Sequence, residues 1–454
     1  MGIIFENSSE GLRISSQRFG WAVRVRGLEG DMMVAPGLVV TDFPLPSISD
    51  AVLAEGLWQT CAEADGNAGR GLIAHMAPQS RMKDAVASHR NAMVELTRQL
   101  VAIPTENPPG NHYRETVALL VKYLEALGFT DTRVEGDCVL SFVGAGSRTL
   151  YFSGHYDVVP AQERSQFDPL VKGANLFGRG SSDMKSGLAA MTYATVALRD
   201  SGLLANGRIA LVFVPDEETA GPRGSRSLAE RGLLGANGFG MLTPEPTGGV
   251  VWNANRGAIT LKITVKGKSA HVGRQHEGVN AFERMIDVAQ ILSKLKTEVE
   301  PRSILLIGGR SEGGTNFNAV PDKCWFTIDR RINPDEDLEQ EKRKLLALLD
   351  APDLDVEVIQ EGRSCSVAED GPLGQALAKA VENITEKKPQ FEMCPGLLEI
   401  RFYAERGIPA YAYGPGLLTV SHGPNEFVPL DRIVQCAQVY ALTAEELLAT
   451  DERG

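Results

Sequence analysis

His155 and Asp157 stand two residues apart at the end of a short apolar run, in the segment TLYFSGHYDVVP. Apolar runs of this length, bounded by small residues, are typical of buried strands in a parallel sheet. Ligands bind beyond the carboxyl ends of such strands, where a histidine next to a carboxylate fits a metal ligand and the group that orients it. Taken alone, the pair fits equally well a loop histidine beside a solvated aspartate.

Four more carboxylates and a second histidine lie at comparable positions. Asp183 occurs in the loop GRGSSDMKSG, Glu245 in LTPEPTG and His422 in SHGPNE. Glu217 and Glu218 directly follow the apolar run IALVFVP, and adjacent side chains can serve one site only from a strand end or turn. Each acidic residue on its own fits a solvated loop charge. Their joint occurrence after apolar runs instead predicts one shared site.

Two histidines and four carboxylates at one sheet edge would repel one another unless cations lie between them. Imidazole and carboxylate ligands suit zinc, with cobalt or manganese as substitutes. The set has a carboxylate too many for one tetrahedral ion. We therefore expect two divalent ions that share a bridging ligand.

Composition and charge limit the class of protein. The 454 residues are 43% hydrophobic and 23% charged, a mixture typical of globular proteins, and the length indicates more than one domain. The net charge of −12 without a basic patch argues against a nucleic-acid partner. Six scattered cysteines without a CxxC pair favour a reducing compartment. No apolar stretch reaches the ~18 residues of a membrane span, and no signal pattern is apparent, so we expect a cytoplasmic protein without membrane contact.

The order of the expected elements indicates an α/β fold. Helical spacing of apolar residues predicts helices over 82–103 and 113–127 and through 191–198, with strands over 149–154 and 207–214. This alternation of helices and strands predicts a doubly wound, mostly parallel sheet.

The pattern changes near residue 256, where apolar and polar residues alternate as in a half-exposed antiparallel strand. A β-α-β-β-α-β order follows, which predicts a ferredoxin-like α+β dimerisation (lid) domain. Its expected elements are strands at 258–267, 303–309, 323–332 and 354–362, and helices at 278–296 and around 345–349.

The predicted domains are a metal-binding catalytic domain over 82–255 and 366–454, with the lid domain inserted at 256–365. Residues 1–81 form an N-terminal extension of unclear structure. The segments 18–27 and 32–43 could be strands, but Gly and Pro interrupt them. An extension from an upstream start and a small accessory subdomain are equally compatible with this stretch.

The motifs GHYDVVP, GRGSSDMKSG, PDEETAG, PEPTGG, GKSAH and SHGPNEF occur in this order. From residue 82 to residue 448 the chain resembles the M20 metallopeptidase and deacylase family. That family includes acetylornithine deacetylase, succinyl-diaminopimelate desuccinylase and carboxypeptidase G2-like enzymes. The resemblance implies that His155, Asp183 and Glu245 hold one metal ion, that Asp183, Glu218 and His422 hold the other, and that Asp183 bridges them.

The same resemblance implies roles for residues around the metals. Asp157 would orient the ring of His155, and Glu217 would be the general base. His271, in GKSAHVG, would reach the active site of the partner subunit in a homodimer and stabilise the oxyanion there. A surface loop histidine is the alternative for His271. The bond from Asp183 to Met184 is expected to be a cis peptide.

Three residues are candidate substrate contacts. Asn318 lies in GGTNFNAVPDK, which resembles the lid segment that reaches across to substrate. Arg330 could be a contact or a structural ion pair. Arg401, in PGLLEIRF, could clamp a substrate carboxylate. The biosynthetic deacylases have a GGTSDxRF-like segment here, and Leu397 and Leu398 replace its small polar pair, which favours a more apolar or aromatic substrate unless both pack in the core.

The sequence thus predicts a metal-dependent amidohydrolase that acts on an N-acyl amino acid or a short peptide-like amide carrying a carboxylate. One alternative keeps the metal site but makes the chain a dipeptidase, or a hydrolase of an unusual C–N bond such as an aromatic amine or formamide. A second is a non-catalytic scaffold, which predicts missing ligands or a missing base. All of these residues are present.

Overall fold

The chain forms two compact units, Met1–Ala77 and Pro78–Gly454. The computed structural model describes residues 3–8, 11–16, 22–24, 78–299 and 302–449.

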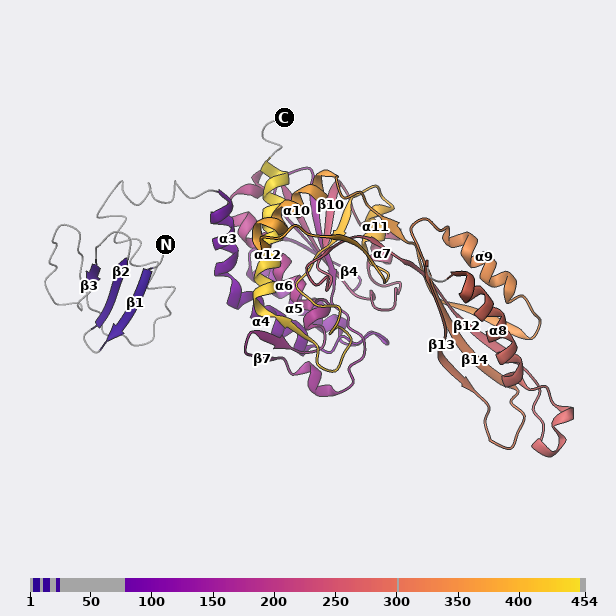
Figure 1. Cartoon of the computed structure of the whole chain (residues 1–454). Helices are drawn as coiled ribbons and strands as arrows, with labels where there is room; N and C mark the ends of the chain where they lie inside the picture. Colours follow the sequence, from indigo (N-terminus) through magenta and orange to yellow (C-terminus); the bar gives the residue numbers. More distant parts are fainter. Residues whose placement is uncertain (1–2, 9–10, 17–21, 25–77, 300–301, 450–454) are drawn as a thin grey trace. The chain divides into compact units, whose positions relative to one another are not determined.

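In the first unit, three short strands pair in sequence order as an antiparallel sheet (Figure 1). They are β1 (Ile3–Ser8), β2 (Gly11–Ser16) and β3 (Ala22–Arg24). β3 lies within the segment 18–27 that could be a strand, whereas the segment 32–43 lies outside the described residues. Both interpretations of residues 1–81 stay predictions.

The second unit is built on a nine-stranded sheet with the order β16-β11-β18-β10-β6-β9-β5-β4, and β17 also pairs with β11. The central strands β18, β10, β6 and β9 run parallel. Every residue of β6 is buried, as expected for a parallel strand covered on both faces. The strands are β4 (Asp131–Glu135), β5 (Cys138–Val143), β6 (Thr149–His155), β9 (Arg208–Val214), β10 (Gly238–Thr243), β11 (Val251–Asn255), β16 (Cys365–Ser366), β17 (Phe391–Cys394) and β18 (Ala410–Ala412).

Helices cover both faces of this sheet. Leu150 and Phe152 of β6 pack in a core cluster with side chains of α4, α6 and α12, whereas Tyr151 packs on the other face with Leu228 of α7 and Tyr403 of α11. The predicted doubly wound α/β fold is therefore confirmed. The helices of this part are α3 (Pro78–Ser88), α4 (Arg90–Ala102), α5 (Tyr113–Ala126), α6 (Ser186–Asp200), α7 (Ser225–Glu230), α10 (Pro372–Thr385), α11 (Ile400–Ala404) and α12 (Leu430–Ala449). None of the described helices combines the length and apolarity needed to cross a bilayer.

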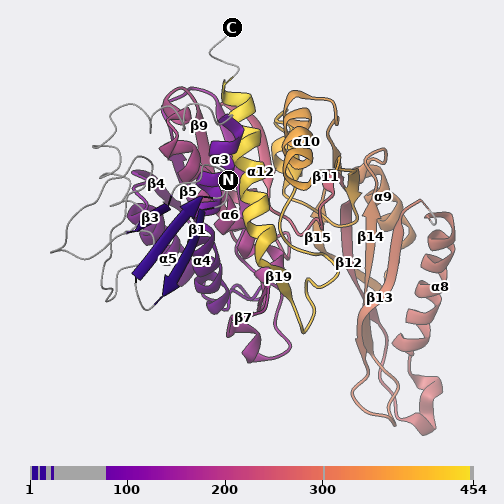
Figure 2. The ribbon, with the colours of Figure 1, turned by 60° about the vertical axis from the view of Figure 1, so that its left-hand side comes forward.

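A four-stranded antiparallel sheet with two helices is inserted between β11 and β16, and we call it the inserted domain (Figure 2). Its strand order β13-β14-β12-β15 is that of a ferredoxin-like unit, as predicted. Alternate residues of β12 are buried against a separate core cluster. The elements are β12 (Gly257–Lys266), α8 (Ala281–Val299), β13 (Ile304–Gly313), β14 (Lys323–Ile332), α9 (Leu338–Leu348) and β15 (Leu354–Gly362). The limits 256–365 stay a prediction.

Two local features differ from the predictions. The helix expected over 82–103 is two helices, because the backbone of His89 (φ −90°, ψ 9°) leaves helical geometry, although no Gly or Pro marks the break. A three-stranded antiparallel sheet of β7 (Leu170–Lys172), β8 (Asn175–Phe177) and β19 (Phe427–Pro429) was not predicted. Strands this short carry too little periodicity to be recognised in a sequence.

Candidate functional site

The predicted site residues lie just beyond the ends of the central parallel strands. His155 is the last residue of β6, Glu217 and Glu218 follow the end of β9, and Glu245 follows the end of β10. Since β6, β9 and β10 run parallel, their carboxyl ends meet at the same edge of the sheet. This topology brings together side chains that are far apart in the sequence.

Two loops add the remaining ligand candidates. Asp183 lies in the turn Ser181–Lys185 that leads into α6, and its peptide bond to Met184 is cis, as expected. His422 lies on the loop between β18 and β19 with a φ of 64°, a left-handed value that is uncommon for a residue other than glycine.

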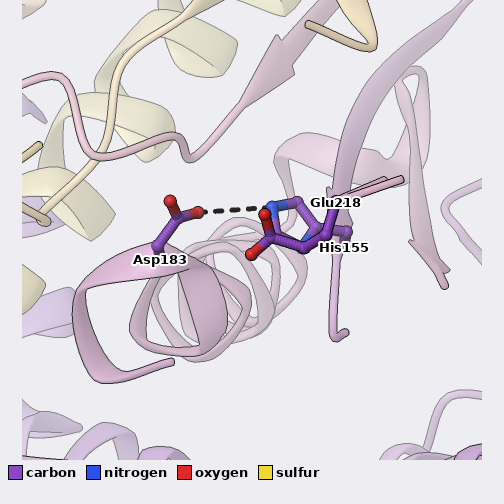
Figure 3. A group of neighbouring side chains, drawn as sticks. All are labelled: His155, Asp183 and Glu218. Carbon is purple, nitrogen blue, oxygen red and sulfur yellow. Dashed lines mark ion pairs between the residues drawn. The ribbon is translucent and has the colours of Figure 1, made fainter. Parts of the chain in front are cut away.

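Asp183 lies between the two histidines. Its Oδ1 atom is 3.3 Å from Nε2 of His155, and its Oδ2 atom is 3.3 Å from Nε2 of His422. Oε2 of Glu218 is also 3.3 Å from Nε2 of His422. Ligand atoms of His155, Asp183 and Glu218 all lie within 4.8 Å of one another (Figure 3). One oxygen of Asp183 therefore faces each imidazole, an arrangement that fits a bridging carboxylate.

The carboxylate oxygens of the site fit a bound cation. Oε1 of Glu218 and Oε1 of Glu245 are buried without a hydrogen-bond partner among the residues that the structure describes. Buried oxygens in native proteins are nearly always paired, and an anionic oxygen left unpaired is the most costly case. Imidazole nitrogens and carboxylate oxygens are zinc ligands. The residues present can therefore hold a divalent metal ion.

Both imidazoles are surrounded by negative charge. Burial alone would lower the pKa of His155, but hydrogen bonds with Asp157 and Asp183 raise it well above its usual value. Hydrogen bonds with Asp183 and then Glu218 raise the pKa of His422 to about 11. Without metal the histidines would carry the positive charge of the site, and a metal ion would compete with these protons.

The three glutamates of the site are correspondingly hard to ionise without a cation. Burial raises the pKa of Glu217 to about 8 against the opposing charge of His155, and repulsion from Glu218 adds to the rise. Burial, followed by repulsion from Glu217, raises the pKa of Glu245 well above its usual value. Divalent ions would reverse this balance because they are larger local charges than any side chain.

Glu245 and Glu217 differ in their relation to the close group of His155, Asp183 and Glu218. Glu245 is 5% exposed and interacts electrostatically with all three of those residues, although it lies outside the closest set. Oε2 of Glu217 is 3.8 Å from Nε2 of His155, and the side chain keeps 13% of its surface exposed. Glu217 therefore borders the cluster from a position that a water molecule can reach.

Asp157 does more than the sequence indicated. Its carboxylate lies 3.3 Å from Nδ1 of His155, whose nearer contact is the backbone carbonyl of Asp157 at 3.0 Å. The same carboxylate accepts the backbone N–H groups of Glu217 at 3.3 Å and Glu218 at 3.2 Å. Asp157 therefore orients the histidine and also fixes the turn that carries both glutamates.

Asn107 supports Asp157 and was not singled out from the sequence. Its Nδ2 atom donates to Oδ2 of Asp157 at 2.9 Å and to the hydroxyl of Thr219 at 3.0 Å. The segment IPTENPPG was interpreted only as a helix end. A buried amide in a loop of prolines is a weak signal, and its partners lie far away in the sequence.

His271 and Asn318 come together in the inserted domain. The backbone N–H of Val272 donates to the carbonyl of Asn318 at 3.0 Å, and His271 forms a β-bridge with Ala319. Both side chains are exposed, and Nδ1 of His271 accepts the N–H of Gly273 at 3.1 Å. Within the described part of the chain, neither side chain forms a hydrogen bond with the metal-site cluster. Their roles stay predictions.

The segment around Arg401 is buried beside the site. The guanidinium donates to the carbonyl of Leu398 at 2.6 Å, and burial lowers its pKa although Glu399 and Glu217 oppose the shift. Leu398 is 3% exposed within the core cluster of α7 and α11, while Leu397 is half-buried. Core packing therefore explains Leu398, and only Leu397 still favours an apolar substrate. Substrate binding by Arg401 stays a prediction.

Arg330 is buried among polar side chains of the inserted domain. Its side chain is 2% exposed, and Nη2 contacts carboxylates of Glu336 at 2.5 Å and Glu341 at 3.0 Å. Nη1 also donates to the hydroxyl of Ser303 at 2.8 Å. Because all of these partners belong to the inserted domain, the contacts favour the ion-pair alternative, and the substrate contact stays a prediction.

Replacing Arg330 with alanine should therefore affect folding rather than substrate binding. Removal of the guanidinium leaves Glu336 without a cation among the described residues and leaves Glu341 with Lys344 alone, which should lower the free energy of unfolding by roughly 3 kcal/mol. We expect KM to stay at the wild-type value in the folded fraction. Denaturant unfolding and steady-state kinetics check this, and a rise in KM without loss of stability would support the substrate-contact role.

A model of peptidase family M20/M25/M40 matches residues 151–446. An M20 family metallo-carboxypeptidase from Sulfolobus solfataricus is similar in structure, with 16% identity, a TM-score of 0.67 and coverage of 79% of this chain and 99% of that chain. A di-peptidase from Saccharomyces cerevisiae gives 16% identity and a TM-score of 0.67, covering 82% of this chain and 99% of its own. Human carnosine dipeptidase 1 gives 15% identity and a TM-score of 0.65, with coverage of 82% and 99%. At these identities the structural matches establish the fold.

Proposed function

The chain belongs to peptidase family M20/M25/M40 and is a metal-dependent hydrolase of peptide or amide bonds, and from this premise we propose that it uses two divalent ions to cleave an N-acyl amino acid or a short peptide-like amide. The products are a carboxylate and an amine. Zinc is the proposed metal, with cobalt or manganese able to replace it.

One observation carries the two-ion proposal. Asp183 presents separate oxygens to His155 and His422, each at 3.3 Å, so one carboxylate can serve a ligand set on either side. Glu218 lies on the His422 side at 3.3 Å. Glu245 is the proposed further ligand on the His155 side.

The chain's own residues supply proton transfer and orientation. Two bound divalent ions would lower the pKa of a shared water and polarise the scissile carbonyl. Glu217 would take the proton from that water and later give it to the leaving amine. The turn that carries Glu217 is held by the hydrogen bond from its backbone N–H to Asp157.

We also propose a homodimer in which His271 completes the partner's site. Apolar side chains that are large and exposed support an interface along α8 and the edge strand β13. They are Phe282 (49% exposed), Ile286 (42%), Ile304 (40%) and Leu306 (51%). Exposed apolar side chains on an edge strand and on the helix that packs beside it support an interaction surface. His271 would act there as the hydrogen-bond donor that stabilises the oxyanion.

A dipeptidase is the second candidate, and two of the structurally similar proteins are named as dipeptidases. A hydrolase of an aromatic amine or formamide is the third. All three candidate functions use the proposed metal site. They differ in the substrate whose C–N bond is cleaved there.

Metal removal tests the proposed function together with the choice of substrate. Chelation should abolish hydrolysis, and zinc, cobalt or manganese should restore it at two ions per chain. A panel of N-acyl amino acids, dipeptides, aryl amines and formamides, assayed with each metal, identifies the bond that is cleaved. Full activity of the metal-free chain would refute the proposal, and a preference for dipeptides would favour the second candidate.

A further inference from the structure

Glu426 is a buried carboxylate to which the proposed reaction gives no task. Its side chain is 2% exposed, and it directly precedes β19. Oε1 accepts the backbone N–H groups of Gly180 at 3.0 Å, Ser182 at 3.0 Å and Asp183 at 3.1 Å. Oε2 accepts from Nη1 of Arg179 at 2.6 Å. Glu426 therefore holds the whole turn that presents Asp183.

Arg179 connects this turn to the loop of His422. Its side chain is 1% exposed, and Nη2 donates to the backbone carbonyl of His422 at 3.1 Å. Nη2 also donates to the side chain of Gln162 at 3.0 Å, and Nε2 of Gln162 donates to the same His422 carbonyl at 3.1 Å. A single buried ion pair thus ties the backbone of Asp183 to the backbone of His422.

We propose that Arg179 and Glu426 are positioning residues that set the separation of Asp183 and His422 for the metal ion those two ligands would share. The inference rests on the proposed two-ion function. Neither residue is among the proposed metal ligands or substrate contacts. They act through the backbone of the two segments that carry Asp183 and His422. Hydrogen bonds from residues that are not themselves ligands commonly orient metal ligands in this way.

Two facts favour this role over general stabilisation. A buried ion pair is by itself a weak source of stability, because desolvation of both charges offsets their attraction. The hydrogen bonds of this pair also go to the turn of Asp183 and to the carbonyl of His422, whose left-handed backbone needs support. The pair is therefore placed to fix ligand geometry.

The variant Arg179→Lys separates charge from geometry. Lysine keeps a positive charge next to Glu426, but one ammonium cannot reproduce the planar fork that reaches Glu426 and the His422 carbonyl together. The full-length chain is stripped of metal and titrated with Co²⁺, and both the visible absorption and the bound metal per chain are followed. We expect one of the two ions to bind about 10–100-fold more weakly than in the wild type, while the other keeps its affinity.

Glu426→Gln is the second variant, because the amide oxygen can still accept the three backbone N–H groups while the charge is lost. It should weaken the same ion. Arg330→Lys is the matched control, since Arg330 is equally buried and also faces glutamates, but in the inserted domain. The control should bind both ions as tightly as the wild type, even if its unfolding temperature falls.

The outcomes separate this inference from the function on which it rests. If Arg179→Lys and Glu426→Gln bind two Co²⁺ ions with wild-type affinity, the positioning role is wrong and the two-ion function stands. If the Arg330→Lys control loses metal to the same degree, general loosening explains the effect and the inference is likewise overturned. If the wild type binds one Co²⁺ ion, the two-ion function itself fails, and this inference fails with it.

Discussion

Replacing Glu217 with glutamine should lower kcat by about 10²–10⁴-fold, the usual contribution of a general acid–base group. Glutamine keeps the size of the side chain but cannot accept the proton of the attacking water. Glu217→Ala should abolish turnover in the same way. Metal content should stay near the wild-type value in both variants, because the closest group of potential ligands contains His155, Asp183 and Glu218 without Glu217. Stopped assays and metal analysis of the same preparations measure the two quantities together.

The adjacent Glu218 provides the matched comparison. Its Oε2 atom is 3.3 Å from His422, so Glu218→Gln should weaken metal binding, and added metal should recover part of its activity. The two neighbouring substitutions are therefore expected to fail in different ways. If Glu217→Gln lost metal and regained full activity on reconstitution, the assignment of the base to Glu217 would be overturned.

The ligand candidates could be predicted because each follows an apolar run that must be a strand or opens a buried helix. Parallel strands bring their carboxyl ends to one edge, so local patterns in the sequence were enough to gather His155, Glu217 and Glu245. The ferredoxin-like order could be predicted for a similar reason, because β12 and β14 alternate buried and less buried residues over most of their length.

Long-range partners could not be predicted, because no local pattern encodes them. Arg330 belongs to a strand pattern that fits an exposed contact as well as a buried ion pair, and only the packing of α9 places Glu341 beside it. Asn107 and Arg179 are ordinary loop residues until folding brings Asp157 and Glu426 within hydrogen-bond distance. Physical chemistry predicts that buried polar groups find partners, but the three-dimensional fold decides which ones.

His271→Ala should reduce kcat by about 10²–10³-fold if its imidazole stabilises the oxyanion. The proposed dimer makes a stronger prediction. When His271→Ala and Glu217→Ala chains are mixed and allowed to exchange subunits, each hybrid dimer should contain one complete site. That site combines Glu217 of one chain with the histidine of its partner. For random exchange of equal amounts, half of the dimers are hybrids, so about one quarter of wild-type activity should return.

The result distinguishes action across the dimer from action within one chain. If His271 served the site of its own chain, every site in the mixture would lack either the base or the histidine, and no activity would return. Mixing Glu217→Ala with Glu218→Ala is the control, because both residues belong to the same site and no exchange can restore it. Recovery in the first mixture alone would establish the homodimer as the catalytic unit. The exposed position of His271, away from hydrogen bonds to the cluster, would then follow from its task in the neighbouring subunit.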